Sequence, residues 1–301
     1  MAVPLEFYRE ENRQGTKRLS MADYAIECKK ITKTFGSVVA NDQIDLKVKK
    51  GEILALLGEN GSGKTTLMNM LSGIYHPDSG EILVNGQTVA INSPVDAMHL
   101  GIGMIHQHFK LVESFRAMDN IVIGTKGKRL TDKELSQKIK EICDKFGLEI
   151  EPEKRVYEMS VSEKQTVEIV KVLYKGADIL ILDEPTAGLD PAGRDEILGL
   201  VSKMHRELGI TILLVSHSME DVAEYVDRII VMNHGAVMFD ALPKQVFAHY
   251  KELEAVGLAA PQVTYLVHEL AERGLPVDTQ ATTAKEAAQT ILSALREKNV
   301  I

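Results

Sequence analysis

Short apolar stretches alternate along the chain with segments of helical periodicity. The strand-like stretches are rich in Ile, Val and Leu, and they cover residues 24–34, 52–57, 102–107, 178–183, 211–216 and 228–232. Strands that alternate with helices are typical of a sheet with helices packed on its faces. The pattern therefore predicts an α/β fold.

Several helix boundaries can be read from the sequence. Pro in the first turn, or an acidic residue three positions after Ser or Thr, marks a helix start, and Gly marks a helix end. The predicted starts are at Ser93-Pro94, Thr131 with Glu134, Asp190-Pro191, Ser218 with Asp221, and Thr283 with Glu286, and the predicted ends are at Gly147 and Gly274.

These signals divide the chain into three parts. Residues 1–22 mix both charges without an apolar core and are expected to be a flexible tail rather than a signal peptide. Residues 23–241 carry the strand signals, with a mostly helical insert at about 93–174. Residues 242–301 lack strand signals and are expected to form a small helical appendage.

Composition excludes several function classes. The formal net charge is -8 and no long run of Lys or Arg occurs, so the sequence does not indicate a nucleic-acid surface. The apolar runs are far shorter than the ~20 residues of a membrane-spanning helix. Cys28 and Cys143 stand far apart without metal-ligand spacing and are expected to be buried small hydrophobes.

A phosphate-binding loop is the strongest motif. Residues 58–65, GENGSGKT, fit G-x-x-x-x-G-K-[ST] and lie between an apolar strand and a helix-like segment. In such a loop, backbone N–H groups surround phosphates, Lys64 adds a positive charge and Thr65 can bind Mg²⁺. The candidate ATP-binding residues here are Gly58, Asn60, Gly61, Gly63, Lys64, Thr65 and Thr66.

Three further strand ends carry candidate chemistry. The strand ILILDE delivers Asp183 toward Mg²⁺ and Glu184 toward the γ-phosphate, where Glu184 would polarise the attacking water. His217 follows TILLVS and could donate to the γ-phosphate or to Glu184, although a lone His there is typical of a cap or core residue. Gln107 ends GIGMIHQ and could sense Mg²⁺ and the γ-phosphate, although alone it would be an ordinary loop residue.

Together these motifs, in this order and spacing with Asp190 included, resemble the nucleotide-binding domain of ABC transporters over about residues 24–239. The resemblance implies a P-loop NTPase fold with a RecA-like core, an antiparallel β part and a helical subdomain. It also implies ATP hydrolysis with Mg²⁺, held by Thr65, Gln107 and Asp183, and catalysis by Glu184, His217 and Gln107.

The same resemblance assigns further residues. Phe35 would stack on adenine, with a buried aromatic as the alternative, and Asp190 would lie in a loop that communicates across a dimer. Residues 159–165, MSVSEKQ, occupy the position of the family's LSGGQ signature, where Ser160, Ser162 and Glu163 would face the ATP held by a partner. Ser162 replaces a glycine at a close backbone approach, so we expect it to weaken that site.

Two branches of the family are represented. Up to about Thr186 the chain resembles the first nucleotide-binding domain of sugar or nucleoside importers, through GIGMIHQHFKLVESF and MSVSEKQTVEIVKVLYKGADILILDEPTA. From Gly188 onward, VSHSMEDVAEYVDRIIVMNHG and the tail beginning PKQVFAHYKELEAVGL resemble the ATPases of energy-coupling factor transporters, which import vitamins and metal ions. Natural recombination, an engineered hybrid and an assembly error are three possible origins of this join.

The resemblance implies a peripheral ATPase at the cytoplasmic face of the cell membrane. Its expected partners are a second ABC ATPase subunit, bound through the C-terminal helices, an integral membrane subunit docked near residues 109–123, and indirectly a substrate-capture protein. Soluble ABC ATPases of translation or repair are a rival class, but their charged linkers and long coiled coils do not occur here. A regulatory pseudo-ATPase that binds nucleotide but hydrolyses it slowly is a third class, suggested only by Ser162. Glu184 and His217 argue against it, and a turnover assay separates it.

Overall fold

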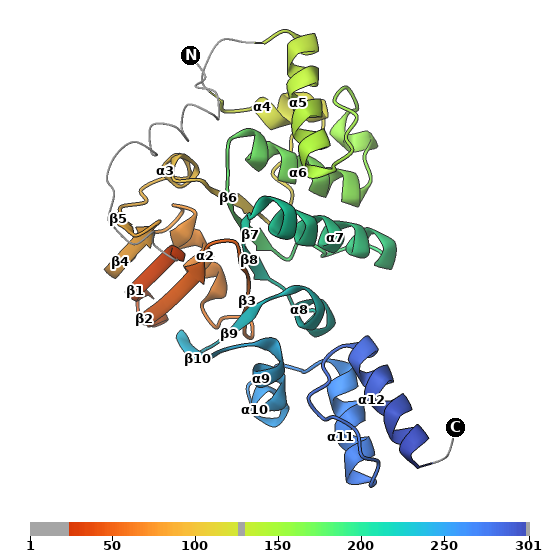
Figure 1. Ribbon diagram of the computed structural model, residues 1–301. Coiled ribbons are helices and arrows are strands. Elements are labelled where there is room, and N and C mark those ends of the chain that lie inside the picture. The colour runs from red at the N-terminus through yellow and green to blue at the C-terminus, as the bar shows by residue number, and fades with distance from the viewer. Residues whose placement is uncertain (1–23, 126–129, 299–301) are drawn as a thin grey trace, which may run out of the picture.

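The central feature is a six-stranded sheet in the order β10-β9-β3-β8-β7-β6 (Figure 1). The computed structural model describes residues 24–125 and 130–298. All neighbours in this sheet are parallel except β9 and β10. The strands are β3 (Ile53–Leu57), β6 (Ile102–Ile105), β7 (Ile179–Asp183), β8 (Thr211–Val215), β9 (Arg228–Asn233) and β10 (Ala236–Ala241). The five parallel strands lie where the hydrophobic pattern predicts them, with ends that differ by one or two residues.

A second sheet is antiparallel and has the order β2-β1-β4-β5. Its strands are β1 (Tyr24–Phe35), β2 (Val38–Lys49), β4 (Ser79–Val84) and β5 (Gln87–Val89). The hydrophobic pattern predicts only β1 of these four. Strands that expose one face or lie at an edge carry fewer apolar residues, so their signal is weaker.

The two sheets share a core around the central strand β3. Because successive side chains of a strand point to opposite faces, Leu54 and Leu56 join the cluster shared with β1, β2 and β4, while Ala55 and Leu57 face the other helices. Helix α2 (Lys64–Leu71) buries Leu67, Met68, Met70 and Leu71 in the first cluster. This packing fixes the turn from β3 into α2.

Side chains or glycine set the helix ends as the sequence predicts. Ser93, Thr131, Asp190 and Ser218 each accept a backbone N–H at the start of a helix, and Gly147 ends α5 in the left-handed conformation. The helices are α3 (Pro94–His99), α4 (Ala117–Val122), α5 (Asp132–Phe146), α6 (Val161–Tyr174), α7 (Pro191–Leu208) and α8 (Met219–Tyr225), with a 3₁₀ turn at Val156–Glu158. The expected insert at 93–174 thus includes β6, a strand of the large sheet, while α4 and α5 lie away from that sheet (Figure 1).

Four helices follow β10 and lie at the opposite end of the molecule from α4 and α5 (Figure 1). They are α9 (Pro243–Ala248), α10 (Tyr250–Ala255), α11 (Gln262–Glu272) and α12 (Ala284–Glu297). Thr283 caps α12, but the carboxylate of Glu286 accepts from the N–H of Thr282 instead of Thr283, so the expected capping box is half formed. Gly274 follows α11 with a positive φ.

The appendage touches the phosphate loop and helix α8. The side chain of Glu59, in the phosphate loop, lies so close to Gly257 that a Cβ there would overlap its carboxyl group. The N–H of Gln262 donates to Glu220 Oε1 on α8 at 3.2 Å. The turn between α10 and α11 therefore contacts the segments that follow β3 and β8.

Other expectations concern the termini, the cysteines and the membrane. The flexible tail expected at residues 1–22 lies outside the described residues. Cys28 and Cys143 are buried as expected, and burial raises the pKa of each thiol, to about 12 for Cys28 and about 11 for Cys143. In the part of the chain that the structure describes, no helix combines the length and apolar character of a membrane span.

Candidate functional site

The phosphate loop joins the buried strand β3 to helix α2. Gly58 and Gly63 have positive φ angles of 152° and 99°. A Cβ at Gly58 would lie 2.5 Å from the carbonyl oxygen of Met232, and one at Gly63 would overlap the carbonyl of Ala40. Close backbone approach therefore requires glycine at both positions.

Lys64 lies inside this loop. Its Nζ donates to the carbonyl oxygens of Gly58, at 2.6 Å, and Glu59, at 2.9 Å. Burial lowers the pKa of Lys64, and the carboxylates of Glu184 and Asp183 oppose that shift. The structure thus places the ammonium group of Lys64 within the phosphate loop and near both carboxylates. The ammonium group and the loop can bind a polyphosphate.

The two acids extend from the carboxyl end of β7. Asp183 pairs in register with Val215 of β8, and the N–H of Glu184 donates to the carbonyl of Val215 at 3.0 Å. Burial raises the pKa of both carboxyl groups. Glu184 also has a φ of 52°, a conformation that costs a non-glycine residue about 1–3 kcal/mol and concentrates at functional sites.

His217 meets Glu184 at this sheet edge. Its Nε2 lies 3.3 Å from Glu184 Oε1. The side-chain pair is within ion-pair distance but is not aligned as a hydrogen bond, so within the described residues Glu184 Oε1 is buried without a hydrogen-bond partner. A carboxylate oxygen in that condition is a strong acceptor for a proton of water.

Gln107 and Thr65 complete a set of oxygen donors with Asp183. Ile105 of β6 pairs with Leu182 of β7, which places Gln107 just beyond the end of β6, next to the acids. Both Gln107 and Thr65 are exposed. Amide, hydroxyl and carboxylate oxygens are the ligands that Mg²⁺ prefers, usually with phosphates completing the coordination. The residues present therefore fit Mg²⁺ bound together with a nucleotide.

Phe35 is exposed, so the buried alternative for this aromatic is wrong. The residue is 44% exposed, and its ring meets Tyr75 edge to face with centroids 5.2 Å apart. Lys33 Nζ lies 5.5 Å from the Phe35 centroid and 2.7 Å from Asp78. Hydrogen bonds from Lys33 and Thr34 lower the pKa of Asp78 to about 2. Tyr75 and Lys33 thus support Phe35, and sequence reasoning missed Tyr75 because only the fold brings it to the end of β1.

The signature residues cap helix α6. Ser160 Oγ accepts from the N–H of Glu163 at 3.2 Å, and Glu163 Oε2 accepts from the N–H of Ser160 at 2.7 Å. Ser162 Oγ lies 3.2 Å from Ser160 Oγ, and Lys154 donates to Glu163 at 2.6 Å. Asp190 in turn caps α7 by accepting from Gly193 at 2.9 Å.

Comparison with known proteins identifies the family. The model of the ABC transporter family matches residues 41–187, a segment that contains the phosphate loop, Gln107, the signature and the acid pair. The energy-coupling factor transporter ATP-binding protein EcfA2 of Clostridium tetani is 39% identical over 264 residues, which are 86% of this chain and 91% of that protein.

This chain is an ATPase of the ABC transporter family.

A second ABC relative matches more closely over a shorter length. The nucleoside import ATP-binding protein NupA of Lactococcus lactis subsp. cremoris is 48% identical over 208 residues. That match covers 68% of this chain, which spans only 41% of the relative. The first relative is thus named for an energy-coupling factor transporter and the second for nucleoside import.

A solved structure confirms the ABC fold. The structure of cbiO1 from Clostridium perfringens, described as part of the ABC transporter complex cbiONQ, superposes with a TM-score of 0.68 at 33% identity. It covers 82% of this chain and 99% of its own. The expected α/β architecture with a P-loop is therefore confirmed.

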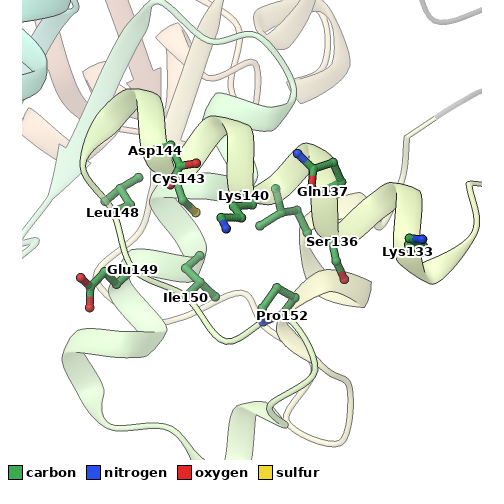
Figure 2. Close-up of a pocket in the computed structure, with 11 residues that line it drawn as sticks. Lys133, Ser136, Gln137, Lys140, Cys143, Asp144, Leu148, Glu149, Ile150 and Pro152 are labelled. Carbon is green, nitrogen blue, oxygen red and sulfur yellow. The ribbon is translucent and has the colours of Figure 1, made fainter.

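One surface pocket of this ABC ATPase lies away from the nucleotide site. It has a volume of about 520 Å³ and lies between α5 and residues 148–152 (Figure 2). Lys133, Lys140 and Cys143 line it, and none of the candidate ATP residues does. We assign it no part in ATP chemistry.

Proposed function

We propose that this chain is the ATP-hydrolysing subunit of an energy-coupling factor type importer for vitamins or metal ions. The observation that carries the proposal is the extent of the EcfA2 match, which covers 91% of that relative and 86% of this chain. The ABC family model ends at residue 187. The longer match therefore includes much of the C-terminal half, where α9 to α12 lie.

The sheet edge supports a hydrolysis mechanism. Lys64 and the amides of the phosphate loop bind the β- and γ-phosphates, and the Phe35 ring stacks on adenine. Glu184 accepts a proton from water and orients it toward the γ-phosphate, while His217 holds Glu184 and contacts the same phosphate. Mg²⁺, which Thr65, Gln107 and Asp183 would hold, neutralises phosphate charge when it is bound.

The proposal includes a dimer. Ser160, Ser162 and Glu163 make their side-chain contacts with one another and with Lys154, on and beside α6, rather than with the phosphate loop. In this family the signature completes the ATP site of a partner subunit. We infer that a second ABC ATPase, identical or different, binds this chain, with the C-terminal helices contributing to the interface.

Membrane partners follow from the same reasoning. The segment 109–123, which contains α4 and the residues before it, carries the exposed side chains Phe115 and Val112. We propose that it docks an integral membrane subunit at the cytoplasmic face of the membrane, with a substrate-capture protein acting through that subunit. The negative net charge gives no support for a nucleic-acid partner.

Nucleoside import is the second candidate. It is favoured by the 48% identity to NupA over 208 residues. In that case the docking surface would select nucleoside permeases. The signature and the segment after Gln107 belong to the part that resembles those importers.

Affinity purification of the tagged full chain from its native membranes tests the proposal. Recovery of a second, distinct ABC ATPase with a small helical membrane subunit would support the energy-coupling factor assignment. Two nucleoside-type permeases would support the alternative instead. Recovery of no membrane protein would contradict both and favour a soluble ABC ATPase.

A further inference from the structure

A buried ion pair lies in the middle of helix α6. Glu168 and Lys171 are one turn apart, and their carboxylate and ammonium groups are 3.1 Å from each other. The side chains are only 5% and 13% exposed. Removing two charges from water is costly, so a buried pair of this kind needs further polar partners.

Those partners are the two backbone groups of Lys110. Its N–H donates to Glu168 Oε1 at 2.6 Å, and its carbonyl accepts from Lys171 Nζ at 2.9 Å. The ion pair therefore satisfies both polar groups of one peptide residue that lies 58 positions earlier in the chain. Bonds between a charged group and a backbone group are about twice as strong as neutral ones.

The contact at Lys110 ties the segment after β6 to helix α6. Strand β6 ends at Ile105, where it pairs with Leu182, and Lys110 is bound to α6. Residues 106–109, which include Gln107, thus span from the sheet to α6 with both ends fixed. Glu168 also lies six residues after Ser162 on α6, a separation of about 9 Å along the helix axis.

We propose that Glu168 and Lys171 are positioning residues that hold the Gln107 loop on the signature helix. The pair fixes the distance between Gln107 and the N-terminus of α6, so a shift of α6 is transmitted to the loop that faces the acids. The role assigned to Gln107 rests on the proposed function. The clamp on Lys110 itself rests only on the contacts described above.

Hydrogen exchange of the full-length chain without nucleotide tests the clamp directly. In both Glu168→Ala and Lys171→Met, we expect amide exchange in peptides covering residues 107–113 to be about tenfold faster or more. The first variant removes the charged acceptor of the Lys110 N–H, and the second removes the cation that holds this acceptor in place. Glu168→Gln keeps an acceptor oxygen, so it should exchange more slowly than Glu168→Ala. Unchanged exchange in both Glu168→Ala and Lys171→Met would overturn the clamp.

The positioning role is tested by the Mg²⁺ requirement of hydrolysis in the purified transporter complex. We expect Glu168→Ala and Lys171→Met each to raise the Mg²⁺ concentration for half-maximal rate by about threefold or more, with the double variant no worse than the stronger single one. If these variants bind a fluorescent ATP analogue without Mg²⁺ as tightly as the wild type does, the raised Mg²⁺ requirement does not come from loss of folding.

Arg228→Met is a matched control. Arg228 forms a buried pair with Glu52 at 3.0 Å and a second ion pair with Asp240 at 2.8 Å, and the Arg228–Glu52 pair also binds backbone groups of Lys47 and Lys49, far from Gln107. It should lower the melting temperature without changing the Mg²⁺ requirement. The positioning role would be refuted if Arg228→Met raised the Mg²⁺ concentration for half-maximal rate as much as Glu168→Ala and Lys171→Met do. It would also be refuted if those two variants exchanged faster without any change in that Mg²⁺ concentration. A wild-type complex that hydrolyses no ATP would refute the proposed function, while the exchange measurement would still decide the clamp.

Discussion

Replacing Gly63 by Ala should cost far more stability than the same change at Gly61. Both glycines have positive φ angles, 99° and 84°, so a left-handed alanine costs about 1–2 kcal/mol at each. At Gly61 a Cβ would meet nothing within 4 Å. At Gly63 it would overlap the carbonyl of Ala40 and lie 2.7 Å from Asn41 Nδ2, which donates to Gly63 O at 3.2 Å.

The difference between the two variants can be estimated from these contacts. Overpacking against backbone adds about 1–3 kcal/mol, and loss of the Asn41 hydrogen bond adds about 1 kcal/mol. We therefore expect Gly63→Ala to lose about 3–6 kcal/mol and Gly61→Ala about 1–2 kcal/mol.

Urea unfolding without nucleotide measures both losses under the same conditions. Because the Gly61 variant carries the same backbone strain, it isolates the contribution of the close approach at Gly63. Equal losses in the two variants would show that left-handed backbone strain alone governs this loop and would refute the packing argument.

Four further predictions concern the site. Glu184→Gln should keep ATP binding and almost abolish turnover, and near-normal hydrolysis would refute its role as the water-positioning base. Burial raises the pKa of Glu184 above its ordinary value of 4.5, so on acidification the wild-type rate should begin to fall while the pH is still above 4.5. Because the folded state binds this proton more tightly than the unfolded state, the contribution of Glu184 to stability should fall as pH rises from the ordinary pKa through the raised one. Profiles of kcat and of the free energy of unfolding against pH test both expectations. Ser162→Gly should raise the ATPase rate of the dimer while lowering stability by about 0.5 kcal/mol because glycine weakens a helix more than serine does, and an unchanged rate would argue against the proposed crowding. Gly257→Ala should raise the KM for ATP because it displaces the Glu59 side chain, whereas Gly274→Ala, which has a similar φ and no close neighbour, should not, and equal KM values would argue that the appendage does not reach the phosphate loop.

Local signals predicted the parts of the site that lie within one strand and the turn after it. The buried strand before Gly58, the strand that ends in Asp183 and Glu184, and the strand before His217 are continuous apolar runs, because parallel strands are buried on both faces. Their carboxyl ends meet at one edge of a parallel sheet, so a correct strand prediction already implied that these residues converge.

Signals of other kinds were too weak or too distant in the sequence. The strands β2, β4 and β5 are partly exposed, so their apolar residues are few and the antiparallel sheet could not be predicted beyond β1. Tyr75 lies 40 positions from Phe35, and no local pattern connects an aromatic after α2 with one at the end of β1.

The sequence by itself determined the family, the phosphate loop, the acid pair and most helix starts, because each depends on residues within a few positions of one another. Only the tertiary structure decided that Lys110 is bound by Glu168 and Lys171, that Glu59 touches Gly257, and that Phe35 is exposed. The first two contacts join segments that are 58 to 198 residues apart. Their formation depends on which elements pack together, and the hydrophobic period of one element shows its buried face but not its partner.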